Sequence, residues 1–241
     1  MKKIIFLCAF MLIAGLSQAQ HKTTSRVVVG TRTVKMGQSN EEFILALPII
    51  NLKYPKLKAA LNDQAFLYGQ TATQTKNGFK AGESGITSFS YEVTHQDERI
   101  LSLILNYETM GAYPSSVTTF ATYNVATGKA YPLSAEVTKE GLSQIFKQLK
   151  DSLNAGAADL RDDSLISAEE KAGVVDDYQD RVNSVKPDEL LDNYVFTQEG
   201  IRFTIGDFLP HVTHALEPEH NWLIPYADIR RYRLPGAKVL K

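Results

Sequence analysis

The sequence predicts an α+β fold, in which an antiparallel or mixed β-sheet packs against about three helices. Apolar and polar residues alternate around Leu101, Leu103 and Leu105, and a period of two is typical of a half-buried strand. Apolar residues also recur at helical spacing in three separate segments, which span residues 56–69, 142–153 and 168–185.

Two β-rich segments begin the predicted fold, Val27 to Val34 and Phe43 to Ile50. The first helix, over residues 56–69, follows Pro55, a residue favoured at the start of a helix. Three glycines between Lys76 and Gly85 predict a loop before the central strands.

The central strands lie between Ile86 and Val125. The polar segment from His95 to Arg99 suits a hairpin turn, and Thr127-Gly128 predicts another turn. A short strand is expected after this second turn, from Ala130 to Leu133. The sheet should therefore be largely antiparallel.

The second helix covers residues 142–153, and a polar, Gly/Ala-rich segment follows from Asn154 to Leu165. Ser167 and Glu170 match a capping box that opens the third helix, which ends before Pro187. A hairpin and a last strand precede a short terminal helix, with strands expected at residues 194–197, 201–205 and 222–226.

The N-terminus has the pattern of a secretory signal peptide over residues 1–19. Lys2 and Lys3 precede an apolar stretch, Ile4 to Leu16, and Ser17-Gln18-Ala19 forms a small-x-small cleavage site. The apolar stretch is shorter than the roughly 20 residues that span a bilayer, so no stable membrane anchor is expected. These features predict an exported protein, periplasmic or extracellular.

Residues 20–241 are expected to form a single α+β domain, or two closely packed lobes over residues 27–135 and 136–241. Cys8 is the only cysteine and lies within the signal peptide, so the mature chain would have no disulfide. The formal net charge of −1 gives no indication of nucleic-acid binding.

Motifs of common enzymes are absent from the sequence, which argues against an enzyme and predicts no cofactor. It has no phosphate-binding glycine loop, no Gly-x-Ser-x-Gly elbow and no His-Glu-x-x-His helix. His211, His214 and His220 are ligand types that zinc accepts, but the prolines around them favour a solvated loop. A metal-dependent hydrolase using these histidines is the first alternative.

Two charged segments give a further alternative, an envelope assembly or interaction protein. Residues 159–192 are rich in acids, and the chain after Asp228 carries bases and no acid. A solvated helix face and a solvated tail are the simpler interpretations, because the carboxylates are spread around the helix.

Several short stretches carry a family resemblance. Tyr54-Pro55 leads into the first predicted helix, Tyr107 is followed by Gly111-Ala112-Tyr113-Pro114, and Asn124 is followed by Gly128-Lys129. They resemble the extracytoplasmic PdaC/RsiV-like module, a domain of unknown function found in a peptidoglycan deacetylase and in a lysozyme-binding anti-sigma factor. The resemblance implies an α+β fold. Because Tyr113 stands where this family often has histidine, no proton or metal role is carried over.

Taken with the export signal, the resemblance favours a non-catalytic binding protein of the cell envelope. The expected ligand is a peptidoglycan or other glycan fragment, or a lysozyme-like protein. The expected ligand-binding residues lie at the sheet face around the family-like turn, at Tyr107, Gly111, Tyr113 and Pro114.

Overall fold

The computed structural model describes residues 26–36, 43–62, 85–110, 113–162 and 167–240. The predicted signal peptide, most of the predicted loop from Lys76 to Gly85, and Gly111 lie outside these ranges. Within them, no helix is both long and apolar enough to cross a membrane.

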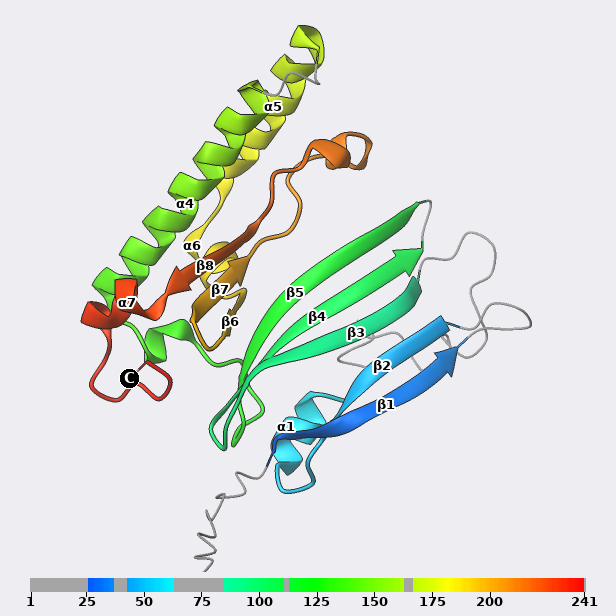
Figure 1. Cartoon of the computed structure of the whole chain (residues 1–241), viewed down its shortest axis with the longest axis vertical. Coiled ribbons are helices and arrows are strands. Elements are labelled where there is room, and N and C mark those ends of the chain that lie inside the picture. Colours follow the sequence, from blue (N-terminus) through cyan, green and yellow to red (C-terminus); the bar gives the residue numbers. More distant parts are fainter. Residues whose placement is uncertain (1–25, 37–42, 63–84, 111–112, 163–166, 241) are drawn as a thin grey trace, which may run out of the picture.

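The structure confirms the α+β class. Its larger sheet is mixed, because β2 runs parallel to β3 whereas the other neighbouring strands are antiparallel. The strand order follows the sequence, and Figure 1 shows β1 and β2 as an outer ribbon. The five strands are β1 (Val28–Met36), β2 (Phe43–Ile50), β3 (Gly85–Gln96), β4 (Ile100–Met110) and β5 (Pro114–Asn124).

The first helix, α1 (Pro55–Ala60), starts at the proline, as predicted, but is shorter than expected. It ends at Ala60, whereas the apolar spacing predicted a helix to residue 69; residues 63–69 lie outside the described ranges. Leu57 and Leu61 are both buried. The short helix and its C-cap residue, Leu61, therefore each contribute one leucine to the core beneath the sheet.

Both predicted turns in the central sheet are present. Asp97 Oδ1 accepts the backbone N–H groups of Arg99 at 2.7 Å and Ile100 at 2.8 Å, which fixes the β3–β4 turn. Gly128 has φ +70°, and a Cβ there would stand 2.6 Å from the Lys56 carbonyl oxygen, so glycine is required.

The strand predicted from Ala130 to Leu133 is wrong. Only one bridge forms there, between Tyr123 and Ala130, and a 3₁₀ helix, η1 (Leu133–Ala135), follows directly. Pro132 has no N–H to donate, which limits a strand at this point.

A second, smaller sheet and the long helices form the other half of the molecule. Helices α4 (Lys139–Asp162), α5 (Ala168–Ser184) and α6 (Pro187–Leu191) precede it. Its antiparallel order is β6-β7-β8. The remaining elements are β6 (Tyr194–Phe196), β7 (Gly200–Thr204), η2 (His211–Leu216), β8 (Asn221–Pro225), α7 (Tyr226–Ile229) and η3 (Arg230–Tyr232).

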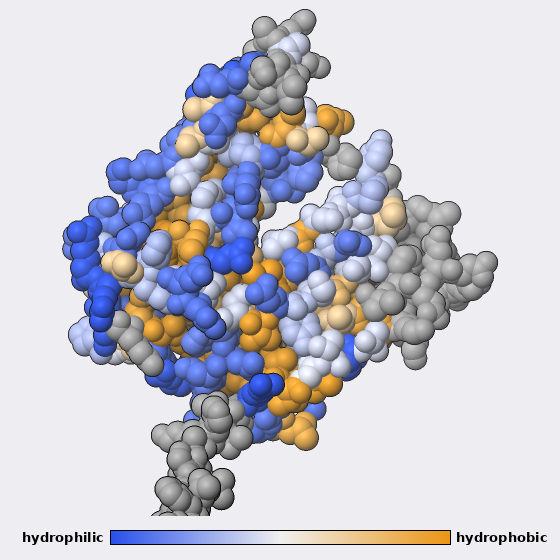
Figure 2. Space-filling model, viewed as in Figure 1, coloured by the Kyte–Doolittle hydropathy of each residue, from blue (hydrophilic) through white to orange (hydrophobic). Residues whose placement is uncertain are grey.

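Two large hydrophobic cores form in the described chain, and apart from Ile100, which joins the second core, they divide it near residues 125–131. One joins the five-stranded sheet to α1, and the other joins α4 and α5 to the smaller sheet. A third, small cluster lies between the two sheets and contains, of the described residues, Ile104, Phe120 and Val195. Figure 2 shows the surface hollowed between the half that carries α5 and the free end of β5. The sheets thus touch over a small area and separate beyond it.

Candidate functional site

Tyr107 must be removed from the expected ligand-binding surface. Its side chain is only 4% exposed and belongs to the core around α1, with its ring centroid 4.9 Å from that of Phe89. The alternation along β4 places it on the same face as Leu101, Leu103 and Leu105, so it packs inside the molecule.

Tyr113 and Pro114 lie at the tip of the β4–β5 hairpin, and both are exposed. The Tyr113 side chain is 65% exposed, and Met110 and Val117 are large apolar residues that are also exposed near this end of the sheet. This surface is therefore accessible, although Tyr107 does not contribute to it.

The three histidines of the loop do not form one centre in the described residues. His214 Nε2 lies 2.9 Å from Asp207 Oδ2, whereas His220 Nε2 lies 2.8 Å from the Tyr178 hydroxyl, within the helical core. His211 is the first residue of η2, and its side chain lies outside the part of the structure that is described. No group of three potential metal ligands occurs among the described side chains.

His220 and Glu217 have structural roles in this loop. The Glu217 carboxylate accepts the backbone N–H groups of Phe208 at 2.9 Å and Leu209 at 2.7 Å, and so ties the two ends of the loop together. Burial lowers the pKa of His220 to about 4 and raises the pKa of Glu217. His220 is therefore a neutral core residue at neutral pH.

The acidic segment has exposed side chains along a helix, and the basic tail is anchored to the fold. Asp176, Asp177 and Asp180 are exposed along α5. In the basic tail, the backbone N–H groups of residues 238–240 all donate to the fully buried Glu136 carboxylate. This arrangement anchors the C-terminal segment to the fold and leaves Arg230 and Arg231 exposed.

A polar cleft between the two sheets brings together residues that are distant in sequence. Glu92 pairs with Ile104 across β3 and β4, and Arg202 pairs with Val195 across β6 and β7. Directly paired residues share a face, so Glu92 and Arg202 lie on the facing surfaces that meet at the small inter-sheet cluster. The cavity there is about 320 Å³ and is lined by Glu92, Val93, Thr94, Thr197, Gln198, Glu199 and Arg202.

Within this cleft, the Arg202 side chain is held in place by two contacts. Its guanidinium carbon lies 5.5 Å from the centre of the Phe120 ring, and its Nε donates to Asn221 Oδ1 at 3.4 Å. The side chain is partly buried, and in the described part of the chain it has no carboxylate partner. A cation held in this way can still donate to a planar anion such as a carboxylate.

Three further side chains of the cleft keep hydrogen-bonding capacity for a ligand. Glu92, Gln198 and Glu199 form no side-chain hydrogen bond within the described ranges. Thr197, by contrast, organises the turn, because its hydroxyl donates to the Gly200 carbonyl at 3.0 Å and accepts from the Glu199 N–H at 3.2 Å. Among the described lining residues, the β6–β7 hairpin thus offers one cation, one carboxylate and an amide, and Glu92 on β3 offers a second carboxylate.

Sequence reasoning missed this cleft because its two walls are about a hundred positions apart. One local signal was available. Arg202 stands between Ile201 and Phe203 in a short strand, so its side chain must point to the face opposite to theirs. The sequence does not reveal, however, that a second sheet faces this side.

Comparisons with known proteins show the fold. No protein-family model matches the sequence, and no curated protein matches it. The structure resembles a member of the DUF3298 family from Bacteroides fragilis, 15% identical, with a TM-score of 0.50 over 88% of this chain and 96% of that chain. It also resembles a DUF3298 family protein from Pseudomonas aeruginosa, 13% identical, with a TM-score of 0.51 over 86% and 94% of the two chains. At these identities the likeness carries no information about a ligand.

Proposed function

We propose that the protein is an exported, non-catalytic binding protein of the cell envelope, and that its ligand is a peptidoglycan fragment bound in the inter-sheet cleft. The Arg202 guanidinium carries this proposal, because it is stacked on Phe120 and has no carboxylate partner among the described residues. The signal-peptide pattern of residues 1–19 supports export.

The chemistry of the cleft suits such a ligand. A peptidoglycan fragment carries sugar hydroxyls, amides and carboxylates on one molecule. Arg202 can donate two parallel hydrogen bonds to a carboxylate, and the exposed carboxylates of Glu92 and Glu199 can accept from hydroxyls and amide N–H groups. The cavity of about 320 Å³ lies within the range of small-molecule sites, about 300 to 1,000 Å³.

The test is a calorimetric titration of residues 20–241 with an N-acetylmuramyl peptide. Replacing Arg202 by glutamine should weaken binding about tenfold, which corresponds to about 1.4 kcal/mol. Arg231→Gln is the matched control, because Arg231 also stacks on an aromatic ring, with its guanidinium carbon 4.7 Å from the Tyr232 ring centre, but lies outside the cleft. A folded parent protein that binds no muramyl peptide would rule out the proposed ligand.

A lysozyme-like protein is the second candidate ligand, and the β4–β5 hairpin end favours it. Tyr113 is 65% exposed there, and β5 is an edge strand of the large sheet. Edge strands and exposed aromatic side chains are common features of protein-binding surfaces. If immobilised lysozyme retains the parent protein and not a folded Tyr113→Ala variant, the protein ligand replaces the glycan as the proposed function.

A further inference from the structure

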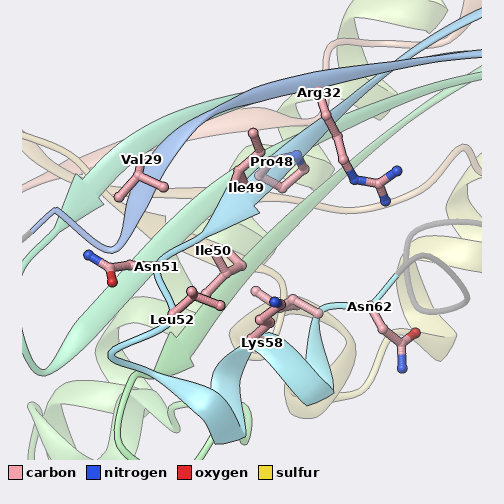
Figure 3. A pocket seen from close by; sticks show the side chains of 10 residues that line it. Val29, Arg32, Pro48, Ile49, Ile50, Asn51, Leu52, Lys58 and Asn62 are labelled. Carbon is pink, nitrogen blue, oxygen red and sulfur yellow. The ribbon is translucent and has the colours of Figure 1, made fainter.

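A second cavity, distinct from the inter-sheet cleft, lies between the β1–β2 ribbon and α1. Its volume is about 670 Å³. Figure 3 shows the residues that line it, which come from β1, β2, the segment after β2, and α1 with its C-terminal end. They are Val29, Arg32, Pro48, Ile49, Ile50, Asn51, Leu52, Lys58, Leu61 and Asn62. We call this cavity the ribbon groove.

Much of the exposed lining of the ribbon groove is apolar. Val29, Ile49 and Leu52 are 52%, 40% and 76% exposed, and they line one continuous cavity. Ile50 and Leu61, also in its lining, belong to the buried core around α1, so the groove is supported from beneath by packed side chains. A contiguous exposed apolar surface of this kind marks a binding site more often than scattered single residues do.

The charged side chains among the described lining residues of the ribbon groove have one sign. Arg32 and Lys58 approach it from β1 and from α1, respectively, as Figure 3 shows, and no aspartate or glutamate is among the described lining residues. Lys58 forms no ion pair within the described ranges.

We propose that the ribbon groove binds a single-chain anionic lipid, an alkyl chain that ends in a carboxylate. The chain lies along Val29, Ile49 and Leu52 and removes their apolar surface from water. The carboxylate lies toward Arg32 and Lys58, because the charged residues of the described lining are both cations and favour an anion. This site is independent of the ligand proposed for the inter-sheet cleft.

The experiment is a calorimetric titration of residues 20–241 with dodecanoate below its micellar concentration. Ile49→Glu places a carboxylate on the groove wall and should weaken binding at least about tenfold. Lys58→Gln removes one cation from an exposed position and should weaken binding about threefold. Dodecyltrimethylammonium, which has the same chain and the opposite charge, should bind at least about tenfold more weakly than dodecanoate.

Val117→Glu is the matched control for Ile49→Glu. Val117 is also β-branched, lies in a strand of the same sheet and is 41% exposed, close to the 40% of Ile49, but it is not part of the groove. This variant should bind dodecanoate as the parent does. Thermal unfolding of each variant checks that the protein is folded before binding is compared.

Several results would overturn the lipid proposal. The first is that the folded parent does not bind dodecanoate. The second is that dodecyltrimethylammonium binds as tightly as dodecanoate. The third is that Val117→Glu weakens dodecanoate binding as much as Ile49→Glu does, which would indicate non-specific adsorption. A dimeric parent that becomes monomeric in Ile49→Glu would instead make the groove a self-association surface. The muramyl peptide titration separates the two proposals, because Ile49→Glu should leave binding in the inter-sheet cleft unchanged.

Discussion

His220 illustrates how burial changes the role of a residue type that often serves function. Its ring lies 4.6 Å from Phe208 and 5.7 Å from Trp222, between ring centroids, and its Nε2 lies 2.8 Å from the Tyr178 hydroxyl. Burial lowers its pKa from the ordinary 6.5 to about 4. At neutral pH this histidine is an uncharged member of the core.

A pH dependence of stability follows from this lowered pKa. The unfolded chain takes up the His220 proton near pH 6.5 and the folded chain only near pH 4, so protons favour the unfolded state between these values. The contribution of His220 to stability is therefore complete above pH 6.5 and is lost as the pH falls toward 4. In urea titrations, His220→Gln should reduce the difference in unfolding free energy between pH 7 and pH 4.5 by about 2 kcal/mol.

The control for this prediction is His214→Gln, because His214 lies in the same loop with an exposed side chain that pairs with Asp207. If His220→Gln leaves the slope between pH 7 and pH 4.5 unchanged, the acid sensitivity comes from other groups. Retention of the slope would also mean that the His220 ring is solvated in the folded protein.

Single-residue roles were the hardest feature to predict from the sequence. Tyr107 has a position in the family-like turn segment that suggests a surface role, and yet strand alternation buries it beside Phe89. The histidine loop looked solvated, but His220 is only 7% exposed. In both cases the deciding factor is which side of an element meets a core, and composition alone does not determine that side.

At the scale of elements the sequence was more informative. The strand predicted from Phe43 to Ile50 is confirmed with its predicted bounds, and the capping-box pattern at Ser167 precedes α5 directly. Helix α4 runs through the Gly/Ala-rich segment after Leu153, because Gly156, Ala157 and Leu160 are buried. Small residues there permit close packing: a Cβ on Gly156 would stand 3.0 Å from the Tyr178 hydroxyl oxygen.

A glycine in the β6–β7 hairpin gives the prediction at this scale. A Cβ on Gly200 would stand 2.2 Å from the Ile224 carbonyl oxygen, which is backbone of the neighbouring strand β8 and cannot rotate away. Gly200→Ala should therefore push β7 and β8 apart and lower the free energy of unfolding by about 2 to 3 kcal/mol in urea titrations.

Gly206→Ala is the matched control, because nothing lies within 4 Å of the Cβ it would add. Its unfolding free energy should stay within about 0.5 kcal/mol of the parent value. Equal stability of the two variants would show that the β7–β8 spacing adjusts without cost.

At the scale of the molecule, side chains of the large sheet contact the smaller sheet in several places. Besides the small cluster of Ile104, Phe120 and Val195, buried polar groups take part: Ser102 and Thr122 share a hydrogen bond of 2.9 Å between their hydroxyl oxygens. These groups then reach β6, because Thr122 donates to the Tyr194 carbonyl at 2.9 Å and Ser102 accepts the Phe196 N–H at 3.3 Å.

The sequence could not indicate this connection. Ser102 and Thr122 alternate with apolar residues along their strands, so the pattern of the sequence predicts an ordinary solvent-facing position for each. Their partners lie in β6, at least 72 positions further along the chain. A buried polar pair of this kind is visible only when the second sheet is in place.

The polar connection gives the last prediction. Thr122→Val keeps the shape of the side chain but removes the donor to the Tyr194 carbonyl and the partner of the Ser102 hydroxyl, both buried. Loss of these bonds should lower the free energy of unfolding by about 1 to 3 kcal/mol. Because β6 is held to β5 through this pair, the amides of Tyr194 to Phe196 should exchange with deuterium faster, while those of α4 near Leu149 should change less.

Thr118→Val is the control on the same strand, since its hydroxyl donates to Asn106 Oδ1 at an exposed position, and it should leave exchange in β6 unchanged. If α4 and β6 lose protection equally in Thr122→Val, the two halves unfold as one unit and the polar pair does not set their connection.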